Sequence, residues 1–321
     1  MVRIAFIGGT YYLGPVAVPF LCEAGHEVAI AHTGAHEHPG VETVEHLHGS
    51  RAELLGTSGL VENWAPEVLV DTFAPGATSA AAEALVECAR RSGTRQIVAV
   101  SSMDVYQHCV DAGMADGSGT VALPAEPIPI GEDAPLRTAP YPGGSAAHDN
   151  VAMEAALHDA GRVTVLRPGA IYGPYPNVRE RYFVERIRDG VRTLKLPDRG
   201  QQIFHRVAVE RVAGAIVAAV GRAPDGFWAC NVVDPYDWTF AGLAGEAARV
   251  LDWEWEPVDV LFSEEDHPWA AAHPIFASDR RLREVLRVEE PDPRAALERT
   301  LRWLWEHRDE LPPLPTTVSA D

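Results

Sequence analysis

Four side chains that can transfer protons or bind a polar substrate lie in the middle of the sequence. Ser102, Asp104 and Tyr106 follow an apolar run that ends at Ser101, and His148 lies near the start of a segment with helical periodicity. A histidine titrates near neutral pH unaided, whereas a carboxylate becomes a useful base when its surroundings raise its pKa. We therefore predict Ser102, His148, Asp104 and Tyr106 as candidate catalytic residues.

A glycine-rich turn follows the first apolar run of the chain and precedes a helix-like segment. It reads Gly8-Gly9-Thr10-Tyr11-Tyr12-Leu13-Gly14. Glycines at such a turn let the backbone approach a pyrophosphate, which binds at the positive end of the helix. A central Tyr11 side chain would crowd the usual phosphate path, so a tight turn without a ligand stays open as an alternative. The predicted cofactor contacts are Gly8, Thr10, Tyr11, Tyr12, Leu13 and Gly14.

The elements that must position these residues alternate between strands and helices. The strand-like segments are near-continuous apolar runs, as expected when both faces of a parallel sheet are covered. Alternation of strands with helices indicates a doubly wound sheet. The predicted strands are 2–7, 27–31, 41–47, 68–73, 96–101, 163–167 and 227–233. The predicted helices are 78–91, 147–159, 182–189, 209–220, 240–251 and 293–308.

We expect an α/β fold with two parts. A Rossmann-type, doubly wound dinucleotide-binding domain would comprise residues 1–167 and about 203–234. A smaller C-terminal substrate-binding lobe would comprise about 168–202 and 235–311. The proline- and glycine-rich stretch 107–144 predicts a long irregular loop over the site, and residues 312–321 predict a flexible tail.

Two further segments resemble motifs of the extended short-chain dehydrogenases/reductases, the family that includes the sugar-nucleotide epimerases and dehydratases. Residues 101–106 resemble Ser-Ser-x-x-Val-Tyr, and residues 167–174 resemble Arg-Pro-x-x-x-Tyr-Gly-Pro. The resemblance spans nearly the whole chain. It implies NAD(P) as the cofactor, a contact from Ser102 to the substrate and a contact from Pro168 to the cofactor. The residues expected to face the substrate are Tyr141, Tyr172 and His205.

The resemblance fails at the Tyr-x-x-x-Lys pair on which the family's chemistry depends. Ala146 and Asn150 stand at the two positions, and Lys195 is the only lysine of the chain, so no other alignment restores the pair. Three replacements remain open for proton transfer: the imidazole of His148, a phenol of Tyr106 or Tyr141, and the carboxylate of Asp104.

The cofactor pocket also departs from the family pattern. The second strand ends in His32-Thr33-Gly34, without the acidic residue that holds ribose hydroxyls in many dinucleotide folds. Ser50 replaces an aspartate common in relatives, and Arg51 can reach a 2′-phosphate. We expect Thr33, Ser50 and Arg51 to contact the cofactor, and Arg51 slightly favours NADP over NAD.

Histidines and overall charge narrow the range of partners. The spacing of the histidines in a loop-like region is not typical of metal ligands. We therefore expect solvated histidines and no metal site at His32, His36, His38, His46 and His48. The net charge of -19 argues against nucleic acid. No apolar run is long enough to span a membrane, and the chain begins with a strand, so we expect a cytoplasmic protein.

Two hypotheses for the function follow. The first is an NAD(P)-binding enzyme of the epimerase, dehydratase or reductase type with non-standard acid–base residues, acting on a small polar metabolite. Its reaction could be redox-neutral, and its setting bacterial specialised metabolism. The second is a non-catalytic member of the same fold that senses a nucleotide or a metabolite. The identity of the substrate and the formation of a homodimer stay open.

Overall fold

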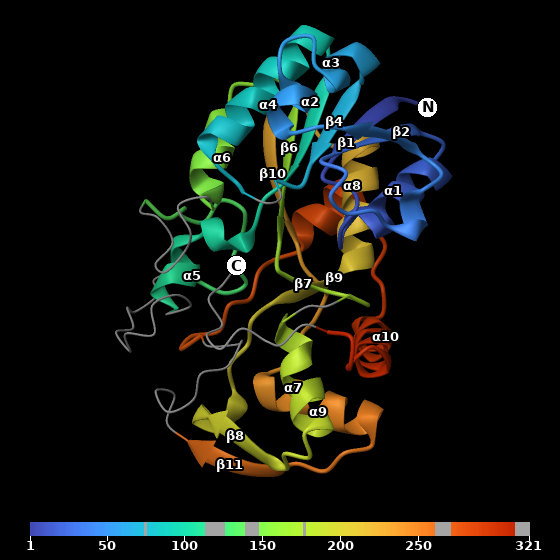
Figure 1. Cartoon of the computed structure of the whole chain (residues 1–321). Helices are drawn as coiled ribbons and strands as arrows, with labels where there is room; N and C mark the ends of the chain where they lie inside the picture. Colours follow the sequence, from blue (N-terminus) through green and yellow to red (C-terminus); the bar gives the residue numbers. More distant parts are fainter. Residues whose placement is uncertain (74–75, 113–125, 139–147, 176–177, 261–270, 312–321) are drawn as a thin grey trace.

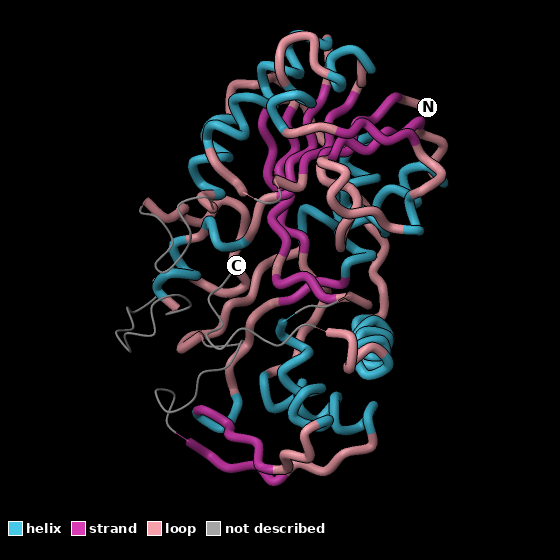
Figure 2. The backbone as a smooth tube through the Cα atoms, in the orientation of Figure 1, coloured by secondary structure: helices cyan, strands magenta, loops and turns pink. Residues whose placement is uncertain are grey.

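The main sheet of the protein has seven parallel strands. The computed structural model describes residues 1–73, 76–112, 126–138, 148–175, 178–260 and 271–311. The strands of the sheet are β1 (Arg3–Ile7), β2 (Glu27–His32), β3 (Glu45–His48), β4 (Val68–Asp71), β5 (Gln96–Val100), β6 (Val163–Pro168) and β10 (Phe227–Val232). Their order is β10-β6-β5-β4-β1-β2-β3. Figures 1 and 2 show this sheet in the same orientation. This is the predicted Rossmann-type arrangement, in which the chain winds outward in both directions from β1.

Helices cover both faces of this sheet (Figure 1). On one face α1 (Gly14–Glu23) packs against α8 (Val209–Arg222), and apolar residues of both join those of the strands in one buried cluster. On the other face α4 (Ser79–Ser92) packs against α6 (Asn150–Leu157), beside α2 (Arg51–Leu55) and α3 (Leu60–Trp64). Burial on both faces explains why the inner strands are mostly apolar, whereas the edge strand β3 carries Glu45, His46 and His48.

A second group of elements lies beyond the carboxyl ends of the strands (Figure 2). It contains α7 (Val178–Arg188), α9 (Phe240–Leu251), α10 (Pro293–Glu306), and two pairs of short strands, β7 (Ala170–Tyr172) with β9 (Arg206–Ala208) and β8 (Thr193–Pro197) with β11 (Glu256–Val260). These helices share a separate apolar core. The exact division of the chain into two domains stays a prediction.

The structure corrects some predicted boundaries. The third strand begins at Glu45 rather than Val41, because Pro39–Val41 form a 3₁₀ turn. Within the loop predicted at 107–144, Gln107–Asp111 form the short helix α5. In the described part of the chain, every helix is too short or too polar to cross a bilayer.

Candidate functional site

A pocket of about 250 Å³ lies at the carboxyl ends of β1, β4, β5 and β6. In doubly wound folds ligands bind at this edge of the sheet. Larger hollows of about 680 and 620 Å³ occur elsewhere on the described surface, but they contain none of the predicted site residues. The pocket is lined by Gly8, Tyr11, Tyr12, Leu13, Thr72, Phe73, Ala77, Val100, Ser101, His148, Asn150, Pro168 and Ile171.

The glycine turn has the tight geometry that its sequence predicts. Gly8 has φ +82°, a conformation that side chains other than glycine rarely adopt. A Cβ on Gly14 would lie 2.1 Å from the carbonyl oxygen of Gly9, so only glycine fits at the start of α1. Among the described residues, the amides of Tyr11, Tyr12 and Leu13 have no acceptor. These donors and the start of α1 form a cradle suited to an anion such as a pyrophosphate.

Two tyrosines narrow this cradle. Tyr11 is 54% exposed, and its ring makes edge contacts with His36 and Tyr175. Tyr12 has φ +52° and stacks on Tyr175 at a centroid distance of 3.6 Å. Burial raises the pKa of Tyr12 well above its ordinary value. Its buried hydroxyl has no hydrogen-bond partner in the described part of the chain, so a polar ligand group can satisfy it.

Asn150, which stands at the expected lysine position, forms a network of polar contacts with Asp104 and His148. The Asn150 amide Nδ2 donates to both carboxylate oxygens of Asp104, at 3.0 and 3.2 Å, and lies 3.0 Å from His148 Nε2. His148 Nε2 is 3.3 Å from Asp104 Oδ2. The side chain of His148 is 45% exposed, whereas that of Asp104 is 12% exposed. His148 and Asp104, two of the alternatives for proton transfer, therefore lie together. Asn150 contacts both, although the sequence singled it out only as the residue that stands at the lysine position.

Ser102 and its neighbour Ser101 have different surroundings. The Ser102 hydroxyl accepts a hydrogen bond from the amide of Asp104 at 3.1 Å and caps a 3₁₀ turn. Ser101 lines the pocket, whereas Ser102 and Asp104 are not among its lining residues. The Ser101 hydroxyl donates to Glu154 Oε1 at 2.6 Å. Glu154 is in turn paired with the buried guanidinium of Arg167 at 2.6 Å. Arg167, the arginine of the second motif, thus holds the carboxylate that accepts a hydrogen bond from the pocket residue Ser101.

Tyr106 is a buried structural residue in this arrangement. Its exposed fraction is 0%, and its hydroxyl donates to Asn231 Oδ1 at 2.6 Å while accepting from Arg167 at 3.0 Å. Burial raises the pKa of Tyr106 far above its ordinary value. Tyr106 is not among the residues that line the pocket. Burial and these two hydrogen bonds therefore favour a structural role for Tyr106 over the predicted catalytic one.

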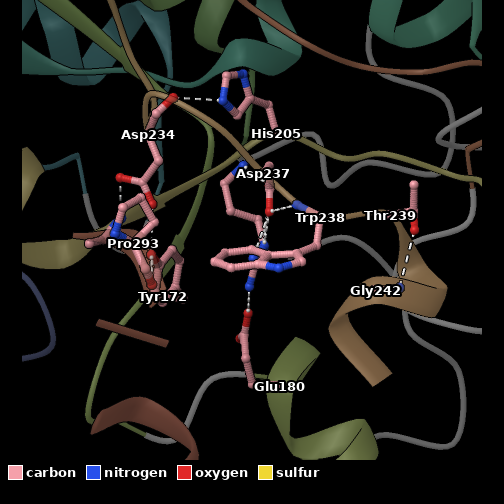
Figure 3. Close-up of polar contacts among 11 residues, drawn as sticks. Tyr172, Glu180, His205, Asp234, Asp237, Trp238, Thr239, Gly242 and Pro293 are labelled. Carbon is pink, nitrogen blue, oxygen red and sulfur yellow. Dashed lines mark hydrogen bonds and ion pairs between the residues drawn. The ribbon is translucent and has the colours of Figure 1, made fainter. Parts of the chain in front are cut away.

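Tyr172 and His205 were expected to face the substrate, but both side chains are 1% exposed and bound to their neighbours (Figure 3). Tyr172 donates to Asp234 Oδ2 at 2.6 Å. His205 Nε2 contacts the carbonyl of Asp234 at 2.9 Å, and its Nδ1 accepts from the amide of Ala277 at 3.0 Å. Burial lowers the pKa of His205 to about 4 and raises that of Asp234 to about 6. Both residues therefore contact Asp234, which follows strand β10 of the main sheet. The third predicted substrate contact, Tyr141, lies outside the described residues.

The residues predicted to contact the adenosine end of the cofactor already form hydrogen bonds with other residues of the protein. The Thr33 hydroxyl accepts from the amide of Ala35, and Ser50 forms a capping box with Glu53 at the start of α2. Arg51 donates to the buried carboxylate of Asp71 at 2.5 Å and to the carbonyl of Ala81 at 3.1 Å. A 2′-phosphate would have to compete with Asp71 for this guanidinium, which weakens the sequence argument for NADP.

The expectation of solvated loop histidines is wrong for part of the histidine-rich region. His32 ends β2 and is 7% exposed, and His46 and His48 lie on β3. The three rings lie within 5.7 Å of one another, measured between centroids. His36, in the connecting segment, and His48, on β3, are exposed, and His38 is partly buried.

Comparisons with solved structures identify the fold. An epimerase from Methanothermobacter thermautotrophicus is 19% identical, with a TM-score of 0.73 over 96% of this chain and 94% of that chain. The Bordetella bronchiseptica enzyme WbmH, solved with NAD⁺, is 17% identical, with a TM-score of 0.71 over 96% and 99%. The Streptomyces venezuelae dTDP-glucose 4,6-dehydratase DesIV, solved with NAD, is 18% identical, with a TM-score of 0.69 over 98% and 100%.

No family model and no curated protein sequence matches the chain. The structural similarity covers nearly all of its length even though fewer than one residue in five is identical. The chain therefore has the fold shared by the NAD-dependent sugar-nucleotide epimerases and dehydratases, as the motifs at 101–106 and 167–174 predicted.

Proposed function

We propose that this protein is an NAD(P)-binding enzyme of the epimerase/dehydratase type that acts on a small polar metabolite, with a nucleotide-linked sugar as the first class to test. The observation that carries the proposal is that one pocket joins the glycine turn to the Asp104–Asn150–His148 network. The turn supplies amide donors for a pyrophosphate, and the network supplies a group that can move a proton.

The residues present fit a dinucleotide in two respects. The Gly8–Gly14 turn is so tight that a Cβ on Gly14 would clash with the Gly9 carbonyl, and Tyr12 presents a buried hydroxyl without a described partner. A nicotinamide cofactor, when bound, supplies hydride transfer at the substrate carbon. Since Arg51 is held by Asp71, we propose NAD as the preferred form.

Proton transfer would fall to His148 rather than to a phenol. His148 lines the pocket, and Asp104 lies close enough to orient the ring and to stabilise the imidazolium formed when it accepts a proton. Asp104 then acts as a positioning residue, and Asn150 fixes the Asp104 carboxylate through its amide. This arrangement replaces the missing Tyr-Lys pair by side chains of another type.

The cofactor claim is tested by calorimetric titration of the protein with NAD and with NADP. We expect binding of NAD, and Gly14→Ala should weaken it by at least about tenfold because the added methyl group meets the Gly9 carbonyl in the phosphate turn. Gly245→Ala is the matched control, since its Cβ would point into open space. Absence of heat with both nucleotides at millimolar concentration would refute the cofactor claim. Binding without turnover of any UDP- or dTDP-sugar would favour the sensing alternative.

We also expect Ser102→Ala to lower turnover by about ten- to a thousandfold, as the loss of a hydrogen bond to a developing charge does. The fold should persist, because the hydroxyl caps a single 3₁₀ turn. Ser278→Ala removes a similar local contact, from the amide of Arg280 at 3.3 Å, away from the pocket. Steady-state rates and circular dichroism of both variants check this. Equal rates in the two variants would remove Ser102 from the site.

A further inference from the structure

We propose that His32, Glu37, His46 and His48 form a binding site for a divalent transition-metal ion, with Zn²⁺ as the first candidate. Each of these side chains offers one ligand atom, and the four atoms all lie within 4.8 Å of one another. Three imidazoles and one carboxylate make a donor set that suits zinc and its neighbours in the first transition series. This proposal is independent of cofactor binding.

The register of two parallel strands brings the histidines together. His32 is paired with His48 across β2 and β3, and His46 lies two residues before His48, on the same face of the strand. The segment between the strands returns Glu37 over this face. Its carboxylate oxygens lie 3.7 Å from His32 Nε2, 3.3 Å from His46 Nδ1 and 3.2 Å from His48 Nε2.

These separations are close to those of a tetrahedral site. Zinc–nitrogen and zinc–oxygen bonds of about 2.0–2.2 Å place neighbouring ligand atoms roughly 3.3 Å apart. The Glu37 carboxylate already has this spacing to His46, through Oε2, and to His48, through Oε1. The ligand atoms of the four side chains lie up to 4.8 Å apart, so the wider pairs would have to close around an ion. His32 Nε2 and His46 Nδ1 are 2.8 Å apart and would have to separate by about half an ångström to admit an ion.

The hydrogen bond of His46 Nε2, the ring nitrogen that faces away from the cluster, resembles that of a metal-ligating histidine. Its Nε2 lies 3.0 Å from the carbonyl oxygen of Val41, which accepts the ring proton and leaves Nδ1 as the lone-pair nitrogen facing the cluster. Ligating histidines commonly hold their second nitrogen in this way. His32 differs, since its Nδ1 accepts from the amide of Gly34 at 3.2 Å. Coordination through Nε2 would move the proton to Nδ1, so this long hydrogen bond would be exchanged for a metal bond.

An ion bound at this cluster would stabilise one edge of the main sheet. β3 is an edge strand of the main sheet, and Glu37 belongs to the segment that connects it to β2. An ion held by all four side chains would fasten this segment to both strands. Binding should therefore raise the thermal midpoint of the protein, because an ion that binds only the folded state stabilises it.

The test uses untagged protein freed of metal with EDTA and titrated with Zn²⁺, while Co²⁺ serves as a spectroscopic probe of tetrahedral coordination. We expect one ion per chain, visible cobalt absorption and a higher thermal midpoint. Loss of a second-layer partner of a metal ligand weakens binding about 10–100-fold, so His46→Gln, which removes a ligand, should weaken it at least roughly a hundredfold. Glu37→Gln should also weaken binding.

His158→Gln is the matched control, because His158 is exposed and its ring contacts Asp159 on the surface. It should bind Zn²⁺ as the parent protein does. Circular dichroism of the metal-free variants shows whether they are folded, and a separate NAD titration keeps this result distinct from the cofactor claim. Binding that is absent in the parent at micromolar Zn²⁺, or that is equal in His46→Gln and the parent, would overturn the proposal and leave a hydrogen-bonded histidine cluster only.

Discussion

Replacing His148 by glutamine should lower turnover by about a hundred- to ten-thousandfold, the range expected when a general base is removed. Sequence reasoning treated His148 and Asp104 as rivals for this role, but His148 Nε2 and Asp104 Oδ2 are 3.3 Å apart. A base and the carboxylate that orients it act as one unit, so their effects are not additive. We therefore expect Asp104→Asn to slow the reaction as well, and the double variant to be no slower than His148→Gln alone.

Steady-state rates of the two single variants and the double variant, measured between pH 5 and 8, check this expectation. Glutamine does not titrate, so dependence of turnover on pH near neutrality should disappear in His148→Gln. His158→Gln, at the other end of α6 and on the surface, is the control for loss of an imidazole. If the two losses multiply in the double variant, the residues act separately. If neither single change slows turnover, proton transfer by this network is wrong.

Much of the fold could be predicted because buried parallel strands have a distinctive sequence. β5 is apolar from Ile97 to Val100, β6 is apolar except for Thr164 and Arg167, and helix α9 has the predicted bounds, Phe240–Leu251. The strands that escaped prediction are short and lie outside the main sheet. β8 carries exposed Thr193 and Lys195, and all but the last residue of β11 are exposed, so neither has the apolar pattern of a buried strand.

The candidate site was harder to predict, because residue type does not tell how deeply a side chain is buried. Tyr106 and Tyr172 belong to motifs that resemble catalytic ones, yet their hydroxyls bond to Asn231 and Asp234, which lie far along the sequence. The histidine cluster depends on the register of β2 with β3, which no local pattern specifies. One signal was present, since His46 and His48 alternate as strand neighbours on one face do.

Replacing Arg206 by methionine should destabilise the protein by about 3–5 kcal/mol, the usual effect of removing one partner from a buried ion pair. Arg206 is 1% exposed and bonds to Glu180 at 2.9 Å and to Asp237 at 2.6 Å. Burial disfavours its charge, but the carboxylates outweigh this effect and raise the pKa of Arg206 above its ordinary value. Its removal would leave two carboxylates, each at most 2% exposed, without their cation.

Urea unfolding of Arg206→Met and of a surface control measures this effect. Arg249 also lies between two carboxylates, Glu246 and Glu298, both at 3.0 Å, but its side chain is 48% exposed. Arg249→Met should cost less than about 1 kcal/mol, because water and salt screen exposed pairs. Should Arg206→Met fail to fold, Arg206→Lys keeps the charge while losing the bidentate contact with Asp237, and should be intermediate. Equal losses in Arg206→Met and Arg249→Met would show that burial does not set the strength of this contact.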